Sequence, residues 1–199
     1  MVAQESERTL ERGDAAPDFD LPGVDGIRYS PSDFGNSEAL LLVFTCNHCP
    51  YAKAKFDLLN DLAEEYDDVS VVGINPNDAD YKPEDSFERM RELVADGTIR
   101  YDAYLRDESQ DVARKYGAVC TPDPFLFARH RDGETGTGGD GSSSKWHLKY
   151  HGRLDNALDP DEEPTEFYVR RAIDSVLAGE QVDLEFMPSR GCSIKWKES

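Results

Sequence analysis

The sequence predicts an α/β fold with a central mixed sheet flanked by helices, and two apolar segments joined by an amphipathic helix are the main evidence. Residues 39–44 form an unbroken apolar run, which is typical of a strand buried on both faces. Apolar side chains spaced by three and four residues follow within 52–66, as expected of a helix that packs on a sheet. Residues 69–74 are rich in β-branched side chains and form the next strand. Strand, helix and strand at this spacing predict a right-handed parallel crossover.

The N-terminal part of the chain is predicted to be only partly ordered. Residues 1–12 are strongly charged and are expected to form a flexible lead-in. Phe19 and Leu21 alternate with acidic residues ahead of an Asp25-Gly26 turn. This pattern predicts a short hairpin, which extends the domain at its N-terminal side.

Three more helices are predicted after the second strand. The first spans about residues 85–96 and the second about 108–116, and each is followed by a glycine that can end it. Asp107 and Gln110 are expected to form a capping box at the start of the second of these helices. The last helix is expected over about residues 165–178, which also end at a glycine.

Two further strands complete the predicted sheet. They are expected at residues 124–128 and 146–151, and the second alternates apolar and polar side chains, so that one of its faces is apolar. Residues 131–144 between them are rich in Gly, Ser and Asp and predict a mobile hairpin insertion. A single domain is expected over residues 13–197.

The composition argues against several classes of partner. The chain has 41 acidic and 22 basic residues, for a net charge of −19, which disfavours nucleic acid and anionic membranes by repulsion. The carboxylates are spread along the chain, as in proteins of halophilic hosts, where salt screens the self-repulsion. The polar N-terminus lacks the apolar core of a signal peptide, and no apolar run is long enough to span a membrane. We therefore expect a cytoplasmic protein without nucleic-acid or membrane partners.

The strongest candidates for reactive residues are Cys46 and Cys49, which lie between the first predicted strand and the helix that follows it. The first turn of a helix favours an anion, so a thiol there ionises more readily and becomes a better nucleophile. A Cys-x-x-Cys pair can also be half of a zinc site, but such a site needs a second close pair, and Cys120 and Cys192 stand far apart. We therefore predict a redox pair, with no metal and no cofactor.

Motifs in four places resemble those of one protein family. Residues 13–21 (GDAAPDFDL), 46–51 (CNHCPY), 121–127 (TPDPFLF) and 191–196 (GCSIKW) are similar to the redoxin branch of the thioredoxin fold. Within that branch they resemble the peroxiredoxin-like, AhpC/TSA-related subgroup that carries two active-site cysteines. The resemblance covers residues 13–197 apart from the insertion, and it implies a thioredoxin-like fold.

The resemblance also implies roles for individual residues. Cys46 would be the more exposed cysteine and would attack the substrate, while Cys49 would resolve the mixed disulfide. His48 between them would stabilise the thiolate. The Thr121–Pro122 peptide bond would be cis and would hold the backbone of a target.

The other two cysteines leave alternatives open. Cys120 lies two residues before Pro122 and is expected near the site, either as a third redox thiol or as a small buried side chain. Cys192 follows the last helix and could return over the sheet to pair with Cys120 or to shuttle electrons.

The function expected from the resemblance is thiol–disulfide exchange in cell redox homeostasis, through Cys46 and Cys49. The partners would be a disulfide-containing protein or small thiol substrate and an electron-donating thiol system.

One alternative is a thiol-dependent peroxidase. Against it, Cys46 occupies the position of the threonine that peroxiredoxins need, and Asp123 has the wrong charge to activate a thiol. Another is a copper chaperone, although the cysteine spacing is one residue short. Thr45 and Leu40 replace the Trp and the buried Asp of thioredoxin, so proton handling is expected to differ.

Overall fold

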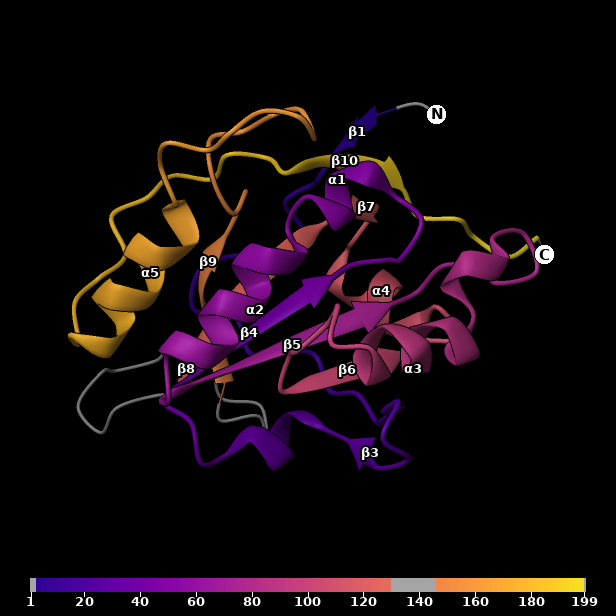
Figure 1. Ribbon diagram of the computed structural model, residues 1–199. Coiled ribbons are helices and arrows are strands. Elements are labelled where there is room, and N and C mark those ends of the chain that lie inside the picture. The colour runs from indigo at the N-terminus through magenta and orange to yellow at the C-terminus, as the bar shows by residue number, and fades with distance from the viewer. Residues whose placement is uncertain (1–2, 130–145, 199) are drawn as a thin grey trace.

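The computed structural model describes residues 3–129 and 146–198. Its centre is a mixed sheet that has five strands within these ranges (Figure 1). In spatial order the strands are β6 (Ala103–Arg106), β5 (Val69–Asn75), β4 (Ala39–Phe44), β8 (Asp123–Arg129) and β9 (Trp146–His151). β6, β5 and β4 run parallel, and β8 and β9 each run antiparallel to their neighbours. The predicted α/β fold with a mixed sheet and a parallel crossover from β4 to β5 is confirmed, and β6 is a strand that the sequence pattern did not indicate.

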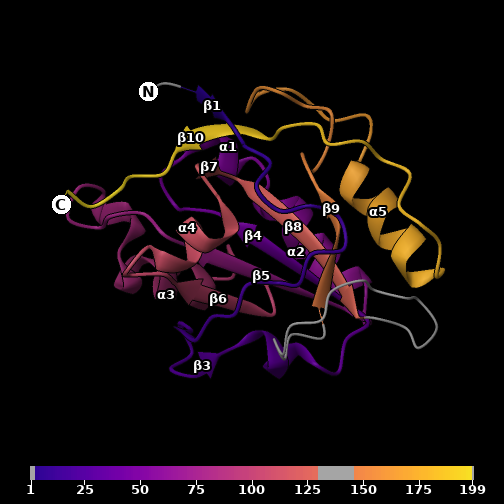
Figure 2. The ribbon, with the colours of Figure 1, turned by 180° about the vertical axis from the view of Figure 1, so that it is seen from behind.

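Helices cover both faces of this sheet. The helices are α1 (Pro50–Lys53), α2 (Phe56–Glu65), α3 (Phe87–Ala95), α4 (Asp111–Tyr116) and α5 (Tyr168–Leu177), with short 3₁₀ helices at η1 (Pro31–Phe34) and η2 (Pro83–Asp85). Figure 1 views the sheet from the side of α2 and α5, and Figure 2 views it from the side of α4. No helix in the described part of the chain is both long and apolar enough to cross a lipid bilayer.

Alternate side chains of β4 enter two separate cores. Leu41 and Val43 pack in the core formed with α2 and α5. Leu40, Leu42 and Phe44 pack in the other core, with α4 and the N-terminal segment. All six residues of β4 are completely buried. Each such apolar side chain contributes about 2 kcal/mol by leaving water, so β4 is a rigid support for the residues that follow it.

The helix predicted within residues 52–66 is broken between Lys53 and Phe56. α1 ends at Lys53 and α2 begins at Phe56, because the N–H of Lys55 donates to the carbonyl of Ala52 in a tighter turn. The ammonium group of Lys55 also lies 2.8 Å from the buried carboxylate of Asp155. Two short helices therefore replace the single predicted one.

The capping box predicted at Asp107 and Gln110 is not formed. The carboxylate of Asp107 accepts from the backbone N–H of Ala113 at 2.8 Å. Gln110 has a φ of 66°, and its side-chain amide donates to the carbonyls of Pro76 and Lys195 instead. The prediction was wrong because this glutamine joins two distant loops rather than capping its own helix.

A second sheet brings the two ends of the chain together. Its strands are β1 (Ala3–Glu5), β10 (Arg190–Ser193) and β7 (Cys120–Thr121), paired antiparallel in that order. Figure 2 shows β1 and β10 side by side above the central sheet. The prediction that residues 1–12 form a flexible lead-in is wrong for Ala3–Glu5, since β10 supplies backbone partners that the local sequence does not reveal.

The predicted N-terminal hairpin is present as a small two-stranded element. β2 (Leu21–Pro22) pairs antiparallel with β3 (Arg28–Tyr29). The predicted insertion at residues 131–144 lies outside the described residues.

Candidate functional site

The candidate site lies where β4 ends. Phe44, its last residue, is level with Ile74 of β5 on one side and with Asp123 of β8 on the other. The chain leaves β4 toward Cys46, and it leaves β5 at Asn75. Loops at the carboxyl ends of parallel strands therefore meet the start of β8 at one edge of the sheet, which is the usual position of a site in α/β proteins.

The peptide bond between Thr121 and Pro122 is cis, as expected. Because it immediately precedes β8, it is held beside the end of β4. Thr121 thereby reaches both cysteines of the predicted redox pair. Its Oγ1 lies 3.1 Å from Cys46 Sγ, and its carbonyl oxygen lies 3.6 Å from Cys49 Sγ.

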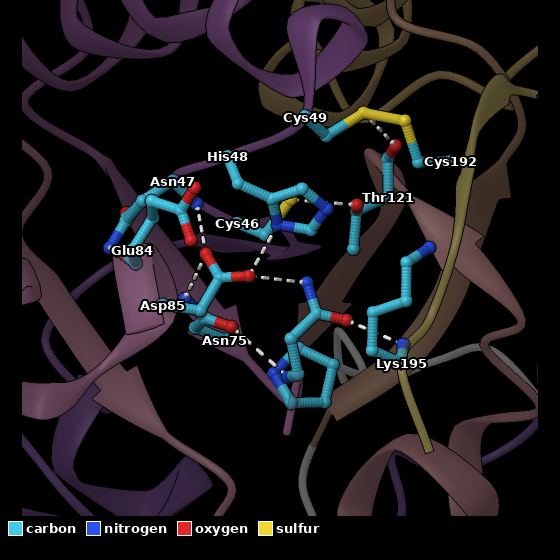
Figure 3. A network of polar contacts seen from close by, with 12 residues as sticks. Cys46, Asn47, His48, Cys49, Asn75, Glu84, Asp85, Thr121, Cys192 and Lys195 are labelled. Atoms are coloured by element: carbon cyan, nitrogen blue, oxygen red, sulfur yellow. Dashed lines mark hydrogen bonds and ion pairs between the residues drawn. A yellow bond between two sulfur atoms is a disulfide. The ribbon is translucent and has the colours of Figure 1, made fainter. Parts of the chain in front are cut away.

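A disulfide joins Cys49 to Cys192, and Cys46 remains a free thiol (Figure 3). The two bonded residues are 143 positions apart in the sequence, with their Cα atoms 6.1 Å apart. All three cysteines pack in one buried cluster with Ala52 of α1. Cys192 of β10 is thus a site residue, and it completes a group of three sulfur atoms.

Pairing with Cys120, one of the two alternatives considered for Cys192, is not formed. Across the β10–β7 ladder, Cys192 is opposite Thr121, and Ser193 is opposite Cys120. Neighbouring residues of a strand point to opposite faces, so Cys192 faces away from Cys120 and toward Cys49. Cys120 is a free, buried thiol on the other face of this ladder.

The thiol of Cys46 is fully buried, and its pKa is raised to about 12. Burial is the main cause, and the negative charge of Asp85 adds to it. The hydrogen bond with Thr121 and the backbone amides of Cys49 and His48 act in the opposite direction but do not compensate.

The prediction of an exposed, readily ionised Cys46 is therefore wrong for this form of the protein. α1 begins at Pro50 and has Cys49 as its N-cap, so Cys46 lies ahead of the first helical turn rather than in it. The helix terminus favours an anion at its own end, and Cys46 is too far along the loop to gain much from it.

Asp85 is the central polar residue of the site, although no sequence pattern indicated it. It is completely buried at the end of η2. Its Oδ1 accepts from the backbone N–H of Asn47 at 2.6 Å and from the amide of Asn75 at 3.3 Å. Its Oδ2 accepts from His48 Nδ1 at 2.5 Å and from the amide of Asn77 at 2.9 Å.

These donors keep the buried carboxylate ionised. Burial by itself would raise the pKa of Asp85, but the hydrogen bond and charge of His48 lower it, as do the bonds from Asn47 and Asn77. The net effect holds the pKa of Asp85 below its ordinary value. Asp85 thus places a negative charge at Nδ1 of the His48 ring.

His48 is bonded to Asp85 and lies near the thiol of Cys46, whose own hydrogen bond is with Thr121 (Figure 3). Its side chain is 4% exposed, its Nδ1 bonds to Asp85, and its Nε2 has no hydrogen-bond partner among the described residues. Ligand atoms of Cys46, His48 and Asp85 all lie within 4.8 Å of one another. Because the Asp85 oxygens already accept four hydrogen bonds, one of them from His48 Nδ1, this group offers a metal fewer free ligands than the four that a structural zinc site uses.

A second buried acidic residue, Asp123, lies next to the cis peptide and is bonded to His151. Asp123 Oδ1 is 2.8 Å from His151 Nε2, across the β8–β9 pair. Burial raises the pKa of Asp123, and the hydrogen bond and charge of His151 oppose this. The His151 ring stacks on Phe125 with centroids 4.0 Å apart. This pair anchors the strand that follows Pro122.

Gly191 allows β10 to approach the site closely. A Cβ at this position would overlap the backbone carbonyl of Thr121. We expect Gly191→Ala to push β10 away from β7 and to lower the fraction of air-oxidised protein that contains the Cys49–Cys192 disulfide at least several-fold. Peptide mapping by mass spectrometry measures this fraction. Ser193→Ala, on the same strand and without such an overlap, is the control, and an unchanged disulfide in Gly191→Ala would contradict the prediction.

Comparisons with known proteins agree with this architecture. The AhpC/TSA family model matches residues 12–134, which is more than half of the chain. A crystal structure titled as an uncharacterized conserved protein from Geobacillus kaustophilus is 35% identical, with a TM-score of 0.82, over 100% of this chain and 98% of that one. A hypothetical protein from Sinorhizobium meliloti is 36% identical, with a TM-score of 0.80, over 98% of this chain and 100% of that one.

A more distant neighbour shows the fold alone. It is a Chlorobium tepidum protein described as a DsbE-type thiol:disulfide interchange protein, 23% identical, with a TM-score of 0.56, over 85% of this chain and 99% of that one. A search with the sequence of this chain found no match among curated proteins. The fold, the Cys-x-x-Cys spacing and the family match agree, and the chain belongs to the AhpC/TSA family of thioredoxin-fold redoxins.

Proposed function

We propose that the protein is a thiol–disulfide oxidoreductase that uses Cys46 and Cys49. One observation carries the proposal: Cys49 is engaged in a disulfide while the free thiol of Cys46 packs in the same cluster, beside the cis peptide of Thr121. A free thiol and a disulfide in one cluster are suited to disulfide exchange, in which a thiolate attacks a disulfide sulfur.

Exchange requires that Cys46 lose its proton. The proton passes from Sγ to the His48 ring, and the carboxylate of Asp85 stabilises the imidazolium that results. The same three types of residue, nucleophile, base and orienting acid, recur in enzymes that activate a thiol or hydroxyl. His48 is therefore the proposed base, and Asp85 is the residue that positions it.

In the reduced protein the reaction has two steps. The thiolate of Cys46 attacks one sulfur of the substrate disulfide, a mixed disulfide forms, and the other substrate sulfur leaves as a thiolate. Cys49 then attacks the sulfur of Cys46, which forms an intramolecular disulfide and releases the second substrate thiol. The substrate, a protein disulfide or a small disulfide, gains two electrons, and an external thiol donor returns two electrons to the protein. Thr121 and Pro122 are proposed to hold the substrate backbone beside Cys46.

The test is catalysed disulfide reduction. Wild-type protein should accelerate the reduction of insulin or of a small dialkyl disulfide by dithiothreitol, and Cys46→Ser should fall to the uncatalysed rate because it lacks the thiol that attacks the substrate. Cys120→Ser removes a buried thiol from the opposite face of the β10–β7 ladder and should retain the rate. Wild-type protein at the uncatalysed rate, or an active Cys46→Ser variant, would refute the proposal.

Copper binding is the second candidate function, because ligand atoms of Cys46, His48 and Asp85 lie within 4.8 Å of one another. Tight, stoichiometric binding of Cu(I) by the reduced protein, without catalysed disulfide reduction, would favour it. Rapid loss of the Cys46 thiol to hydrogen peroxide, again without disulfide reduction, would favour the thiol peroxidase.

A further inference from the structure

We propose that Cys192 is a third redox thiol and that Cys49 exchanges its disulfide partner between Cys192 and Cys46. The proposal rests on the oxidoreductase function above and adds a second oxidised form to it. In one form Cys49 is bonded to Cys192, as in the structure. In the other it is bonded to Cys46.

The contacts around Thr121 carry this inference. Cys46 Sγ is 3.1 Å from its hydroxyl, and Cys49 Sγ is 3.6 Å from its carbonyl oxygen, so both sulfurs flank one residue. Cys192 is bonded to Cys49 and lies opposite Thr121 in the β10–β7 ladder. The free thiol therefore lies in the same buried cluster as the disulfide that it would attack, and Figure 3 shows both groups on the two sides of Thr121.

The exchange is balanced without an external oxidant or reductant. The thiolate of Cys46 attacks Cys49 Sγ, the bond between Cys46 and Cys49 forms, and the bond between Cys49 and Cys192 breaks. Cys192 leaves as a thiolate and takes up the proton that Cys46 released. One thiol and one disulfide are present before and after, so the reaction runs in either direction.

Cys192 stays in place when its disulfide is broken, because backbone contacts hold its strand. It is opposite Ala3 on one side of β10 and opposite Thr121 on the other. Just beyond the strand, the N–H of Lys195 donates to Asn77 Oδ1 at 2.8 Å, and the carbonyl of Lys195 accepts from Asp78 at 2.8 Å. The released thiolate thus remains next to Cys49 at a high effective concentration, which favours exchange within one molecule.

Partner exchange gives the third thiol a defined task. After a substrate has been reduced, the oxidised protein holds the Cys46–Cys49 disulfide. Attack by Cys192 on Cys49 moves the oxidation to the Cys49–Cys192 disulfide and returns Cys46 to the thiol form. The donor thiol then reduces a disulfide that no longer includes the residue that meets the substrate.

The experiment follows both disulfides over time. Fully reduced wild-type protein is oxidised with one equivalent of diamide, samples are quenched in acid, free thiols are alkylated, and the disulfides are mapped by mass spectrometry. The Cys46–Cys49 disulfide should appear first and then give way to Cys49–Cys192 until a constant ratio is reached. Cys192→Ser should stop at Cys46–Cys49, Cys46→Ser should form only Cys49–Cys192, and Cys120→Ser should behave like the wild type.

Two results would overturn the proposal. One is a wild-type time course that contains only Cys49–Cys192 from the first sample to the last. The other is a Cys192→Ser variant that has a native circular dichroism spectrum but forms no Cys46–Cys49 disulfide. Both are distinct from failure of the proposed function, which is judged by catalysed insulin reduction in the wild type. Active wild-type protein that forms only the Cys46–Cys49 disulfide would refute the exchange and leave the proposed oxidoreductase mechanism intact.

Discussion

Replacing Cys49 with serine should remove the whole stabilising effect of oxidation, which we expect to be about 5 kcal/mol in the wild type. The Cys49–Cys192 disulfide closes a loop between residues 143 positions apart. In the chain-entropy description, a crosslink of this span lowers the entropy of the unfolded chain by an amount equivalent to about 5 kcal/mol. The free energy of unfolding in urea, measured with and without dithiothreitol, gives the difference.

The cysteine variants separate this effect from other consequences of substitution. Cys120→Ser should show the same difference between oxidised and reduced protein as the wild type. Cys192→Ser can close only the short loop from Cys46 to Cys49, so oxidation should stabilise it far less. A Cys49→Ser variant that still gains several kcal/mol on oxidation would show that a different disulfide constrains the chain.

Asp85→Asn should destabilise the protein by about 3 kcal/mol, although the two side chains have almost the same shape. Both carboxylate oxygens of Asp85 accept two hydrogen bonds each. Whichever way an asparagine amide is turned, its NH₂ group meets two donors, and the charge that faces His48 is lost. Urea unfolding at neutral pH measures the loss. Asp61→Asn removes a charge from the exposed side of α2 and should change the stability by less than about 0.5 kcal/mol.

The effect of Asp85 should also depend on pH in a defined direction. Its pKa in the folded protein is below the ordinary value of 3.8, so the unfolded chain binds this proton more readily. The stabilising contribution is therefore complete above pH 3.8 and is lost as the pH falls through the lower, folded-state pKa. The wild type should lose stability along this acid limb, and Asp85→Asn should show a flatter limb. Identical limbs would mean that folding does not lower the pKa of this carboxyl group.

The same variant tests the proposed proton transfer. If Asp85 stabilises a protonated His48, Asp85→Asn should slow the attack of Cys46 on a small disulfide on the order of 100-fold. The rate is measured under conditions where both proteins remain folded, as judged by circular dichroism. Loss of stability without any loss of rate would assign Asp85 to the fold alone.

The sequence predicted the parts of this structure that depend on local patterns. The apolar run of β4 and the β-branched run of β5 are long enough to define buried strands, and the thiols between β4 and α1 follow from them. The cis peptide at Pro122 was predicted from the family resemblance, since residue type alone permits either isomer. The site could thus be located on the chain before its geometry was known.

The rest depends on contacts between distant segments, which local patterns do not encode. Asp85 is the last residue of a short 3₁₀ helix, and its local sequence resembles that of many surface aspartates in a chain with 41 acidic residues. Its importance comes from donors on other loops, among them Asn47 and His48. The partner of Cys192 likewise follows from the register of β10 against β7. β6 has four residues and β1 has three, too few for a periodic pattern to emerge.

The pairing of β1 with β10 also has a consequence for how the protein should be handled. Without β1, the outer edge of β10 would present unpaired backbone groups beside Cys192. An open edge of this kind is a template for strand addition by another molecule, and a cysteine on it can crosslink two chains. Ala3–Glu5 cover this edge by pairing with β10, so deletion of these residues should promote disulfide-linked aggregation.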